Sequence, residues 1–555
     1  MAKPKTIALI QARVSSSRLP FKHFRTVGDK SILEWILTRL STLVDLDDIL
    51  ISTCREPGSE LFKQYQDRYN YKVFEYEGDV NDVAERHYRA TQFLPADYYL
   101  YISGDCPLIG EELIQDMLKT IRNRKCDRVV VDGQTIHEGI SICSRESIRF
   151  VRNHSFTHEQ KENFGYQVDM STLDMVRIPV PEKYRPKPCR ISVDNMADLR
   201  FMKAVYGQCN RHKKIFCLES VIEILESHPE LLLHHKHVRQ KKVGFQPKKF
   251  LLWTHAAREI GFGHLARMIG LAQELNETYH HGIAFLVNED KEAIEKLTAE
   301  GYDKDYYIYQ DTIPLRALQN LSYDTLIVDV AGVDDTHPFL RNLTSKKVFF
   351  YDSLPKTNHA DAYLIQGIQP TLPEKKQKVY SGWGTIFLNK RLEYEILRHP
   401  CKQGFFVSLG ASDPQGWLPK VVAALKNKTI NLVLGKYRTQ IDENYFLPTV
   451  HVLSQKEIPQ ATASCEKAIC AFGVTFYELL ISGAQVLVLT RNDHDRQIVT
   501  RLAEQYACAV IEPDELDADN FMENFHNMRP GCSLYEMYRT ERRQLLETLL
   551  YKKKQ

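Results

Sequence analysis

The stretch TIALIQARVSSSRLPFK, residues 6–22, determines how we expect the first part of the chain to fold. Residues 6–10 form a short apolar and β-branched run, which predicts a buried strand. The segment that follows is rich in serine and carries the candidate binding residues Gln11, Arg13, Ser16, Arg18 and Lys22. Ligands of open α/β sheets bind at the carboxyl ends of the strands, and small residues beside cations favour phosphate groups. The sequence therefore predicts a triphosphate-binding loop, with a solvated basic loop as the alternative.

The same kind of pattern continues along the whole chain, because short apolar runs alternate with longer amphipathic ones. Residues 6–10, 32–40 and 49–52 give the first strand, helix and strand of this series. Such alternation is typical of βα units and predicts an α/β fold with mostly parallel sheets.

The length of 555 residues predicts between three and four folding units, at roughly 150 residues per domain. The stretch KHVRQKKVGFQPKK (236–249) is basic and poor in apolar residues, and a new apolar run follows at 250–254. This composition is typical of a linker, and the histidines within 234–237 lack the carboxylate or cysteine companions of a metal site. A second seam lies near 396–403. We therefore predict a first domain at 1–238, a linker at 239–249, and two lobes at 250–398 and 399–555.

Composition and charge exclude several classes of protein. Lys and Arg number 73 against 71 Asp and Glu, so the net charge of +2 gives no field that recruits nucleic acid or an anionic membrane. No apolar run approaches the roughly 18 residues of a membrane span, and the start lacks a signal-peptide core. The twelve cysteines include no C-x-x-C pair. We therefore expect a cytoplasmic chain with reduced cysteines.

Two acidic residues are placed where they can bind a metal ion. The apolar run at 98–103 leads directly into Asp105, and a predicted strand at 190–193 ends at Asp194. Both carboxylates would leave a strand at its carboxyl end, where they can converge on Mg²⁺ that bridges phosphates. For either acid alone, a turn or a helix cap is the alternative.

Four ordered motifs over about residues 1–245 resemble the cytidylyltransferases of the spore-coat-polysaccharide type, relatives of the CMP-sialic acid and CMP-Kdo synthetases. The motifs are QARVSSSRLPFK (11–22), GDVNDVAERHY (78–88), SGDCPLI (103–109) and SVDNMADL (192–199). The resemblance implies a Rossmann-like nucleotidyltransferase domain in which a sugar hydroxyl attacks the α-phosphate of CTP and pyrophosphate leaves. It assigns CTP binding to Gln11, Arg13, Ser16, Arg18 and Lys22, and Mg²⁺ binding to Asp105 and Asp194. Phe21 stands where the family has glycine, so we expect hindered backbone approach there.

A second glycine loop follows the apolar run at 250–254. It reads Gly261-Phe262-Gly263-His264 and leads into an apolar helix. Glycines allow a tight turn, and a helix N-terminus favours anions and disfavours a cationic imidazole. His264 is therefore a candidate neutral base, with a capping or hydrogen-bonded histidine as the alternative.

The last part of the chain adds further small-residue loops. SLGASDPQG (408–416) follows an apolar run, and Gly473 precedes a helix that carries Thr475 and Glu478. Thr475 can donate to a phosphate from the first helical turn, and a carboxylate at 478 can accept both hydroxyls of a ribose. The alternative is that Thr475 and Glu478 form a capping box.

This half of the chain, about 250–525, resembles the glycosyltransferase-B (GT-B) superfamily, specifically the UDP-sugar hydrolase of pseudaminic acid biosynthesis. The motifs are IGFGHLAR (260–267), GWGTIFLNKRLEY (382–394), SLGASDP (408–414) and FGVTFYELLISGAQVLVLTRNDHDRQ (472–497). The resemblance implies a two-lobed, double Rossmann-like domain in which His264 activates water for inverting attack on the anomeric carbon, releasing UDP. It assigns UDP-sugar binding to Gly263, Arg267, Gly410, Gly473, Thr475, Glu478 and Gln497.

Together the two resemblances predict a bifunctional enzyme of nonulosonic acid biosynthesis, of the pseudaminic or legionaminic type. One half would hydrolyse a UDP-2,4-diacetamido-2,4,6-trideoxyhexose, and the other would load the nonulosonate onto CMP. A phosphoenolpyruvate-dependent nonulosonate synthase is the expected pathway neighbour, and a homodimer is compatible with this prediction. Two alternatives stay open: the second half is a true UDP-sugar glycosyltransferase, or one half binds nucleotide without catalysis.

Overall fold

The computed structural model divides the chain into two compact units, Met1–Pro247 and Lys248–Gln555, called here the N-terminal and C-terminal units. Their boundary falls within 239–249, the range assigned above to a linker. The residues that the structure describes are 3–133, 136, 140–185, 189–239, 245–258, 260–310, 322–333, 340, 347–351, 360–369, 378–399, 402–411, 413, 415–437, 449–516 and 521–551.

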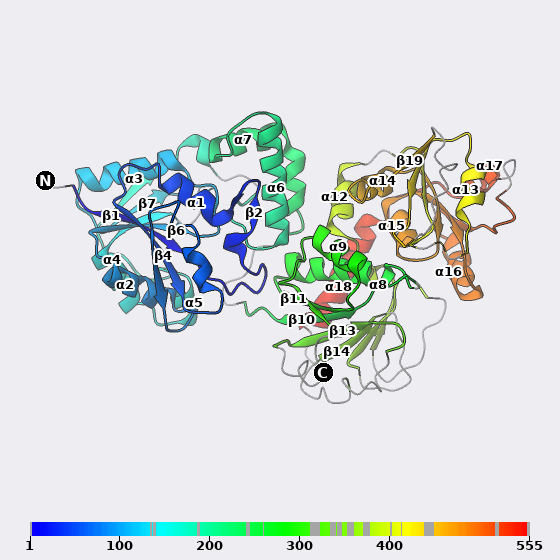
Figure 1. Cartoon of the computed structure of the whole chain (residues 1–555), viewed down its shortest axis with the longest axis horizontal. Helices are drawn as coiled ribbons and strands as arrows, with labels where there is room; N and C mark the ends of the chain where they lie inside the picture. Colours follow the sequence, from blue (N-terminus) through cyan, green and yellow to red (C-terminus); the bar gives the residue numbers. More distant parts are fainter. Residues whose placement is uncertain are drawn as a thin grey trace. The chain divides into compact units, whose positions relative to one another are not determined.

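The N-terminal unit contains a seven-stranded sheet in the order β5-β4-β1-β6-β8-β7-β9, coloured blue to cyan in Figure 1. Its strands are β1 (Thr6–Gln11), β4 (Asp48–Cys54), β5 (Lys72–Tyr76), β6 (Tyr98–Ser103), β7 (Arg128–Asp132), β8 (Ser141–Ser144) and β9 (Met175–Pro179). All pairings are parallel except those of β8. Gln11 at the end of β1 lies opposite Ser52 and Ser103, so the binding loop leaves the middle of the sheet.

Helices alternate with the strands of this unit, as the sequence pattern predicts. They are α1 (Ile32–Leu40), α2 (Val83–Phe93), α3 (Glu111–Asn123), α4 (Arg145–Asn153), α5 (His158–Glu162), α6 (Met196–Arg211) and α7 (Leu218–Ser227). The first matches the predicted helix at 32–40, and a capping box formed by Ser31 and Glu34 sets its start. A 3-10 helix at Lys22–Phe24 and the short strands β2 (Thr26–Val27) and β3 (Lys30–Ser31) precede it.

The predicted strand at 190–193 is wrong, because the structure has no strand there. The segment is extended, and the Val193 N–H donates to the carbonyl of Asp105 at 2.9 Å. The next backbone N–H, that of Asp194, donates instead to the Asp198 carboxylate at 2.9 Å. The Asp194 N–H is therefore bound by a side chain at the start of α6, and it cannot extend the backbone hydrogen bonds of a strand. The single backbone bond still brings Asp194 beside Asp105.

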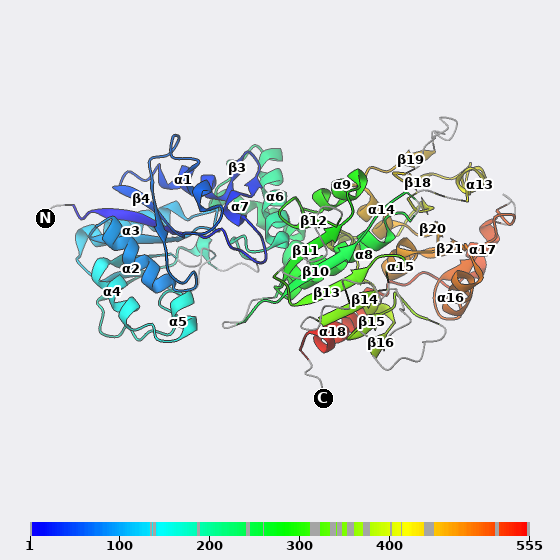
Figure 2. The same cartoon turned by 60° about the horizontal axis from the view of Figure 1, so that its bottom comes forward.

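The C-terminal unit contains two sheets in which every strand pairing is parallel. The middle sheet has the order β12-β11-β10-β13-β14-β15-β16, which Figure 2 shows strand by strand. Its strands are β10 (Lys249–Thr254), β11 (Gly282–Val287), β12 (Tyr307–Tyr309), β13 (Thr325–Asp329), β14 (Lys347–Tyr351), β15 (Ala362–Leu364) and β16 (Lys378–Tyr380). The α/β fold class predicted from the sequence is confirmed.

The C-terminal sheet has the order β19-β18-β17-β20-β21-β22. Its strands are β17 (Phe405–Ser408), β18 (Ile430–Val433), β19 (Val450–Val452), β20 (Lys467–Ala471), β21 (Gln485–Leu489) and β22 (Cys508–Val510). The helices of this unit are α8 (Gly263–Gln273), α9 (Lys291–Ala299), α12 (Lys390–Arg398), α13 (Leu418–Ala424), α14 (Ile458–Ser464), α15 (Val474–Ser482), α16 (Asp493–Ala503), α17 (Phe521–Asn527) and α18 (Tyr535–Tyr551).

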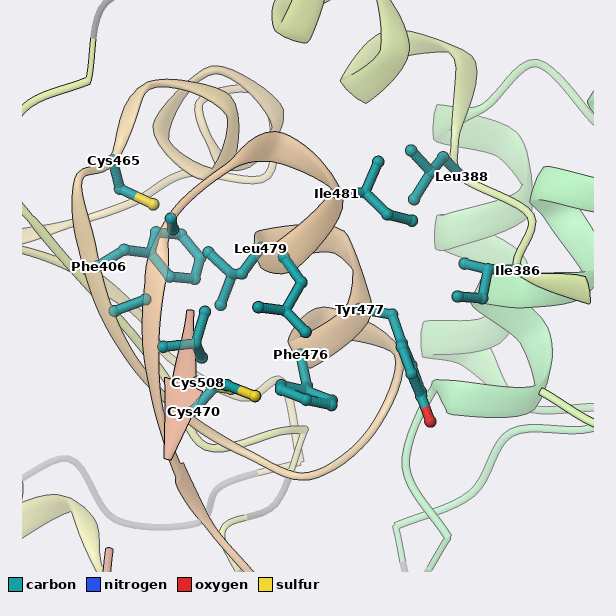
Figure 3. Close-up of a cluster of buried hydrophobic side chains, with 14 of the residues drawn as sticks. Ile386, Leu388, Phe406, Cys465, Cys470, Phe476, Tyr477, Leu479, Ile481 and Cys508 are labelled. Atoms are coloured by element: carbon teal, nitrogen blue, oxygen red, sulfur yellow. The ribbon is translucent and has the colours of Figure 1, made fainter. Parts of the chain in front are cut away.

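A buried apolar cluster packs α15 against the C-terminal sheet (Figure 3). Phe406 from β17, Cys470 from β20 and Leu479 from α15 belong to it. Tyr477 points away from these residues in the close-up and packs its ring on Gly367, where a Cβ atom would lie 2.3 Å from the ring. This glycine, with φ +70°, therefore allows the two sheets of the unit to approach.

No helix among the described residues is long and apolar enough to cross a membrane.

Helix α18 joins the two halves of the C-terminal unit through a buried ionic cluster. Arg542 of α18 lies 2.6 Å from Glu393 Oε1, and Lys390 Nζ lies 2.9 Å from the same oxygen. Glu274, which follows α8, pairs with both cations. All four side chains are buried, and their charges cancel. The cluster connects α8, α12 and α18 in one network.

Candidate active sites

The candidate site of the N-terminal unit lies where β1 and β6 end. Lys22 Nζ is 2.5 Å from Asp105 Oδ2 and 3.2 Å from Asp194 Oδ1. Arg18 Nη2 lies 3.0 Å from the same oxygen of Asp194. The side chains of Lys22 and Arg18 are only 13% and 17% exposed, so the alternative of a solvated basic loop is wrong. Both predicted metal ligands converge on one cation.

The charges of this cluster perturb one another strongly. Burial opposes the charged form of Lys22, but Asp105 and Asp194 outweigh it and raise the pKa of Lys22. Burial would likewise raise the pKa of Asp105, but Lys22 lowers it. Against burial again, Lys22, Arg18 and Arg190 hold the pKa of Asp194 far below its usual range. Both carboxylates are therefore ionised at neutral pH.

Two residues that the sequence analysis did not assign support Asp194. Arg190 Nη2 lies 2.9 and 2.7 Å from the two carboxylate oxygens of Asp198, and its Nη1 lies 3.8 Å from Asp194 Oδ2. Asp198 in turn accepts the backbone N–H of Asp194. The second acid of the motif SVDNMADL, four residues after Asp194, was the available signal. This pair orients the Asp194 side chain.

The loop after β1 engages the remaining predicted side chains in separate contacts. The Tyr101 hydroxyl donates to Gln11 Oε1, and Arg13 Nη1 donates to Asn81 Oδ1 at 3.1 Å. Ser16 Oγ accepts a backbone N–H three residues later. In the described part of the chain, none of these three side chains hydrogen-bonds to the carboxylate cluster. Gln11 is the last residue of β1, and Arg13 and Ser16 lie on the loop that leads to Arg18 and Lys22.

His23 and Phe21 fix the backbone of this loop. His23 accepts the Arg13 N–H at Nε2 (3.2 Å) and donates from Nδ1 to the Gly104 carbonyl (2.7 Å). Its burial lowers its pKa to about 4, so the ring is neutral. Phe21 adopts the left-handed conformation, with φ 53°, that favours glycine. Its ring lies against Gly58, so the loop keeps a glycine-like turn with an aromatic residue.

The same loop presents two successive backbone donors to one anion. The N–H groups of Val14 and Ser15 donate to Glu56 Oε1, at 2.6 and 3.0 Å. Successive N–H groups of this kind form anion-binding nests. The loop backbone therefore has an anion-binding geometry, and Glu56, which no sequence pattern had indicated, supplies the anion.

The carboxylate pair fits a divalent metal ion. Mg²⁺ is usually held by one or two carboxylates, with substrate phosphates and water as the other ligands. Asp105 and Asp194 both contact one cation, Lys22, and a metal ion bound by both carboxylates would need the same closeness between them. Among the described residues, no group of three or more His, Cys, Asp or Glu side chains forms a fuller metal site. Mg²⁺ at this position stays a prediction.

The candidate site of the C-terminal unit lies where β10 and β13 end. His264 is the second residue of α8 and Asp329 the last of β13, and His264 Nδ1 lies 2.6 Å from Asp329 Oδ1. Arg267 donates to both Asp329 oxygens, at 2.7 and 2.6 Å. His264 Nδ1 also lies 2.9 Å from Arg267 Nη2. Burial would raise the pKa of Asp329, but Arg267 lowers it, so the nearer partner of Nδ1 is an ionised carboxylate that can only accept, which favours a proton on His264 Nδ1. In this tautomer of the neutral ring, Nε2 carries the lone pair that a general base needs. The N-cap of α8 is Phe262, so His264 is not a cap.

Asp329 and Gln366 are members of this site that the sequence analysis missed. Asp329 ends the buried run TLIVD, and an acid directly after such a run was the signal that had led to Asp105. Gln366 Oε1 accepts from Arg267 Nη1 at 3.1 Å. The Gln366 side chain is buried, and its Nε2 has no hydrogen-bond partner in the described structure. No pattern in the sequence marks Gln366.

Three further predicted residues lie at the start of α15. Gly473 is the N-cap of this helix, and no side chain caps it, so the capping-box alternative for Thr475 and Glu478 is wrong. Burial raises the pKa of Glu478, and the charge of Lys296 on α9 opposes this rise. Glu478 lies on α15, which packs on the C-terminal sheet, and Lys296 lies on α9, beside the middle sheet. The two side chains are therefore close enough for their charges to interact.

The loops of the two sheets meet near α8. A Cβ atom on Gly261 would lie 3.4 Å from the Cβ of Ala411, which follows Gly410. The rings of Phe262 and Tyr437 stack at 4.8 Å. The glycine loop before α8 therefore contacts the loops after β17 and β18, as a site shared by two lobes requires.

The remaining predicted parts of this site are Gly263, Gln497 and the small-residue loop at 408–416. Gly263 is the first residue of α8 and precedes His264. Gln497 is exposed on α16, and no hydrogen bond links it to another predicted site residue that the structure describes. Ser412 and Pro414 of the predicted small-residue loop lie outside the described residues.

Comparisons with known proteins match the N-terminal unit most directly. Residues 7–241 match the family model described as Cytidylyltransferase. The spore coat polysaccharide biosynthesis protein SpsF of Bacillus subtilis is 21% identical, over 40% of this chain and 94% of its own length. A cytidylyltransferase structure from Leptospira borgpetersenii covers 41% of this chain and 97% of its own, with 20% identity and a TM-score of 0.37.

The N-terminal unit is a cytidylyltransferase domain. The spore coat polysaccharide biosynthesis protein SpsG of Bacillus subtilis is also related to the chain, with 24% identity over 48% of this chain and 85% of its own length. A match over 48% of 555 residues is longer than the 247 residues of the cytidylyltransferase domain, so it extends into the C-terminal unit.

Proposed function

We propose that the N-terminal unit transfers CMP from CTP to a hydroxyl of a sugar acid and releases pyrophosphate. The observation that carries this proposal is the convergence of Asp105 and Asp194 on Lys22 at the end of the central strands. Lys22 and Arg18 would exchange these carboxylates for phosphate oxygens and neutralise the charge of the leaving pyrophosphate. Asp105 and Asp194 would hold Mg²⁺, which supplies Lewis-acid stabilisation of the α-phosphate.

We further propose that the C-terminal unit, a GT-B domain, hydrolyses a UDP-sugar. The arrangement of His264, Asp329 and Arg267 supports this proposal, because it holds His264 by Nδ1 and leaves Nε2 free at the carboxyl ends of parallel strands. Asp329 would hold the tautomer and stabilise the imidazolium that forms on proton transfer. Thr475 and Glu478 would bind the phosphate and ribose of UDP.

The two reactions suit one biosynthetic route. The sugar released from UDP would become a nonulosonate by condensation with phosphoenolpyruvate on a separate synthase, and the cytidylyltransferase domain would then activate it. A cytoplasmic location and a homodimer belong to the same proposal. The supporting observation is that each unit carries its own cluster of buried charged residues at the carboxyl ends of its strands.

Separate assays test the two halves. For the N-terminal unit, the whole chain is incubated with CTP, Mg²⁺ and candidate nonulosonates, and pyrophosphate is measured for the unaltered protein, Asp105→Asn and Asp194→Asn. Full activity in both variants contradicts the metal assignment. For the C-terminal unit, a panel of UDP-sugars is screened by mass spectrometry for water-dependent UDP release, with His264→Ala as the variant. An unchanged rate in this variant contradicts the role of His264.

A further inference from the structure

A second histidine lies beside the proposed base of the C-terminal unit. The ring centroids of His255 and His264 are 4.8 Å apart, with the rings edge-to-face at 80°. His255 follows β10, and the next residue, Ala256, is held at both backbone groups by one side chain. Asn288 Oδ1 accepts the Ala256 N–H at 3.1 Å, and Asn288 Nδ2 donates to the Ala256 carbonyl at 2.8 Å. The backbone at His255 is therefore fixed.

Neighbouring groups decide where each imidazole carries its proton. The Ala331 N–H donates to His255 Nε2 at 3.2 Å, so this nitrogen is unprotonated. Burial lowers the pKa of His255 to about 4, so the neutral ring carries its proton on Nδ1. His264 turns Nδ1 toward Asp329 Oδ1 and Arg267 Nη2, so its free nitrogen is Nε2. The ionised Asp329 oxygen is the nearer partner and can only accept, which favours a proton on Nδ1. Among the described residues, neither His255 Nδ1 nor His264 Nε2 makes a hydrogen bond.

The distance between the rings decides what this donor and this acceptor can do together. Inverting glycosidases place their acid and base on opposite faces of the sugar, roughly 6.5–9.5 Å apart, to leave room for a water molecule. Rings with centroids 4.8 Å apart are too close for that division of roles. A centroid distance of 4.8 Å is short enough for one oxygen atom to reach a nitrogen of each ring.

We propose that His255 and His264 hold one oxygen nucleophile between them, with His255 Nδ1–H donating to it and His264 Nε2 accepting its proton. The inference rests on the UDP-sugar chemistry proposed for this unit. A new bond forms between this oxygen and the anomeric carbon, and the bond from that carbon to the diphosphate oxygen breaks, with its electron pair leaving on UDP. The nucleophile's proton moves to His264, and the His255 proton stays in place.

This clamp selects the chemical class of the nucleophile. Water or a hydroxyl oxygen has two lone pairs, so it can accept from His255 and still attack with the other. An amine has only one lone pair and would lose it to His255. His255 is therefore a specificity residue for oxygen nucleophiles.

Substitutions at His255 test the clamp in the whole chain. His255→Ala removes the donor, whereas His255→Asn keeps an N–H group near the position of Nδ1. We expect His255→Ala to lower kcat for UDP-sugar cleavage about tenfold or more, with the KM and the UDP dissociation constant within about threefold. His255→Asn should recover most of the rate. His526→Ala, at an exposed site on α17, is the control. A full rate in His255→Ala, or a loss that arises from weaker UDP binding, overturns the proposal.

A spectroscopic measurement separates this inference from the proposed function. Nitrogen chemical shifts of ¹⁵N-labelled histidine report the tautomer of each neutral ring, and His255→Asn assigns the signals. The clamp requires His255 protonated at Nδ1 and His264 protonated at Nδ1. If no UDP-sugar is cleaved by the unaltered chain, the hydrolase proposal fails, and these spectra still decide the clamp. A His255 ring protonated at Nε2 excludes it.

Discussion

Lys22 Nζ lies 2.5 Å from Asp105 Oδ2, so a lysine that the sequence assigns to CTP is the counter-ion of a carboxylate assigned to the metal. The two roles are linked, because Lys22 cannot neutralise phosphates and carboxylates at the same time. Binding of Mg²⁺ and CTP therefore requires the lysine to exchange one set of oxygens for the other. This exchange can be measured.

Replacing Lys22 by Gln should separate metal binding from catalysis. The variant leaves Asp105 and Asp194 without their shared cation, so we expect tighter binding of Mn²⁺ in the absence of nucleotide, measured by titration calorimetry. CMP transfer should fall about a hundredfold, because the phosphates lose a positioned cation. Lys119→Gln, at an exposed site on α3, should change neither quantity. Unchanged Mn²⁺ affinity in Lys22→Gln would contradict the exchange.

Asp329→Asn should abolish most of the proposed UDP-sugar hydrolysis. An amide at this position can donate to His264 Nδ1 and so favours the wrong tautomer, and a comparable change in a serine protease triad costs about 10⁴-fold in kcat. We expect a loss of at least about 10²-fold in kcat with unchanged UDP affinity, measured by UDP release and calorimetry. Arg267→Lys should have a smaller effect, because it keeps the charge beside Asp329. Equal rates for Asp329→Asn and the unaltered chain would exclude the pair.

The buried ionic cluster on α18 should be essential for the stability of the C-terminal unit. Glu393→Ala leaves Lys390 and Arg542 with one carboxylate, Glu274, for two buried cations. Breaking a buried pair in this way costs about 3–5 kcal/mol in the free energy of unfolding. Urea denaturation of the whole chain should show this loss in the C-terminal transition. Glu536→Ala, exposed on the same helix, should change it by less than about 0.5 kcal/mol.

Two substitutions at Phe21 should have different effects on stability and CTP binding. Phe21 has φ 53°, which glycine adopts freely and a β-branched residue avoids. We expect Phe21→Gly to keep CTP binding, because it relieves the left-handed conformation. Phe21→Val should destabilise the N-terminal unit by about 1–3 kcal/mol and weaken CTP binding. Denaturation and calorimetry check both variants, and equal behaviour of the two would show that the turn conformation is unimportant.

Acid should destabilise the cytidylyltransferase domain through His23. Its pKa is about 4 in the folded protein and about 6.5 when unfolded, so the unfolded chain binds more protons between these values. The contribution to stability is complete above pH 6.5 and is lost as the pH falls towards 4, by about 3 kcal/mol. Thermal unfolding at a series of pH values should show this slope, and His23→Gln should flatten it. An identical slope in the variant would assign the effect to other groups.

The sequence was sufficient to predict the features that depend on local patterns. The strand before Gln11, the helix at 32–40 and the acid after the strand at 98–103 follow from periodicity and turn chemistry, and the structure has all three. Asp194 was predicted from the end of a strand that does not form, and the motif that contains it gave a second reason to choose it. Asp329 shows the same local signal and could have been predicted.

Other parts of the sites depend on contacts between distant segments. The Glu56 carboxylate reaches the loop after β1 only through the fold of the sheet, and Gln366 reaches Arg267 across 99 positions. Such partners carry no local signature, because each is an ordinary polar residue in its own segment. The sequence alone did not indicate a role for His255, because that role depends on the distance between its ring and that of His264 and on the Ala331 N–H.

The last turn of α18 returns to the point where the C-terminal unit begins. Lys248 Nζ donates to the carbonyl of Leu550 at 2.8 Å, so this hydrogen bond holds the start of the unit next to the last turn of α18. A unit with adjacent ends can be joined to another polypeptide, or have its order of segments permuted, without disturbing its core. The adjacent ends of the C-terminal unit are therefore compatible with its attachment to a nucleotidyltransferase domain.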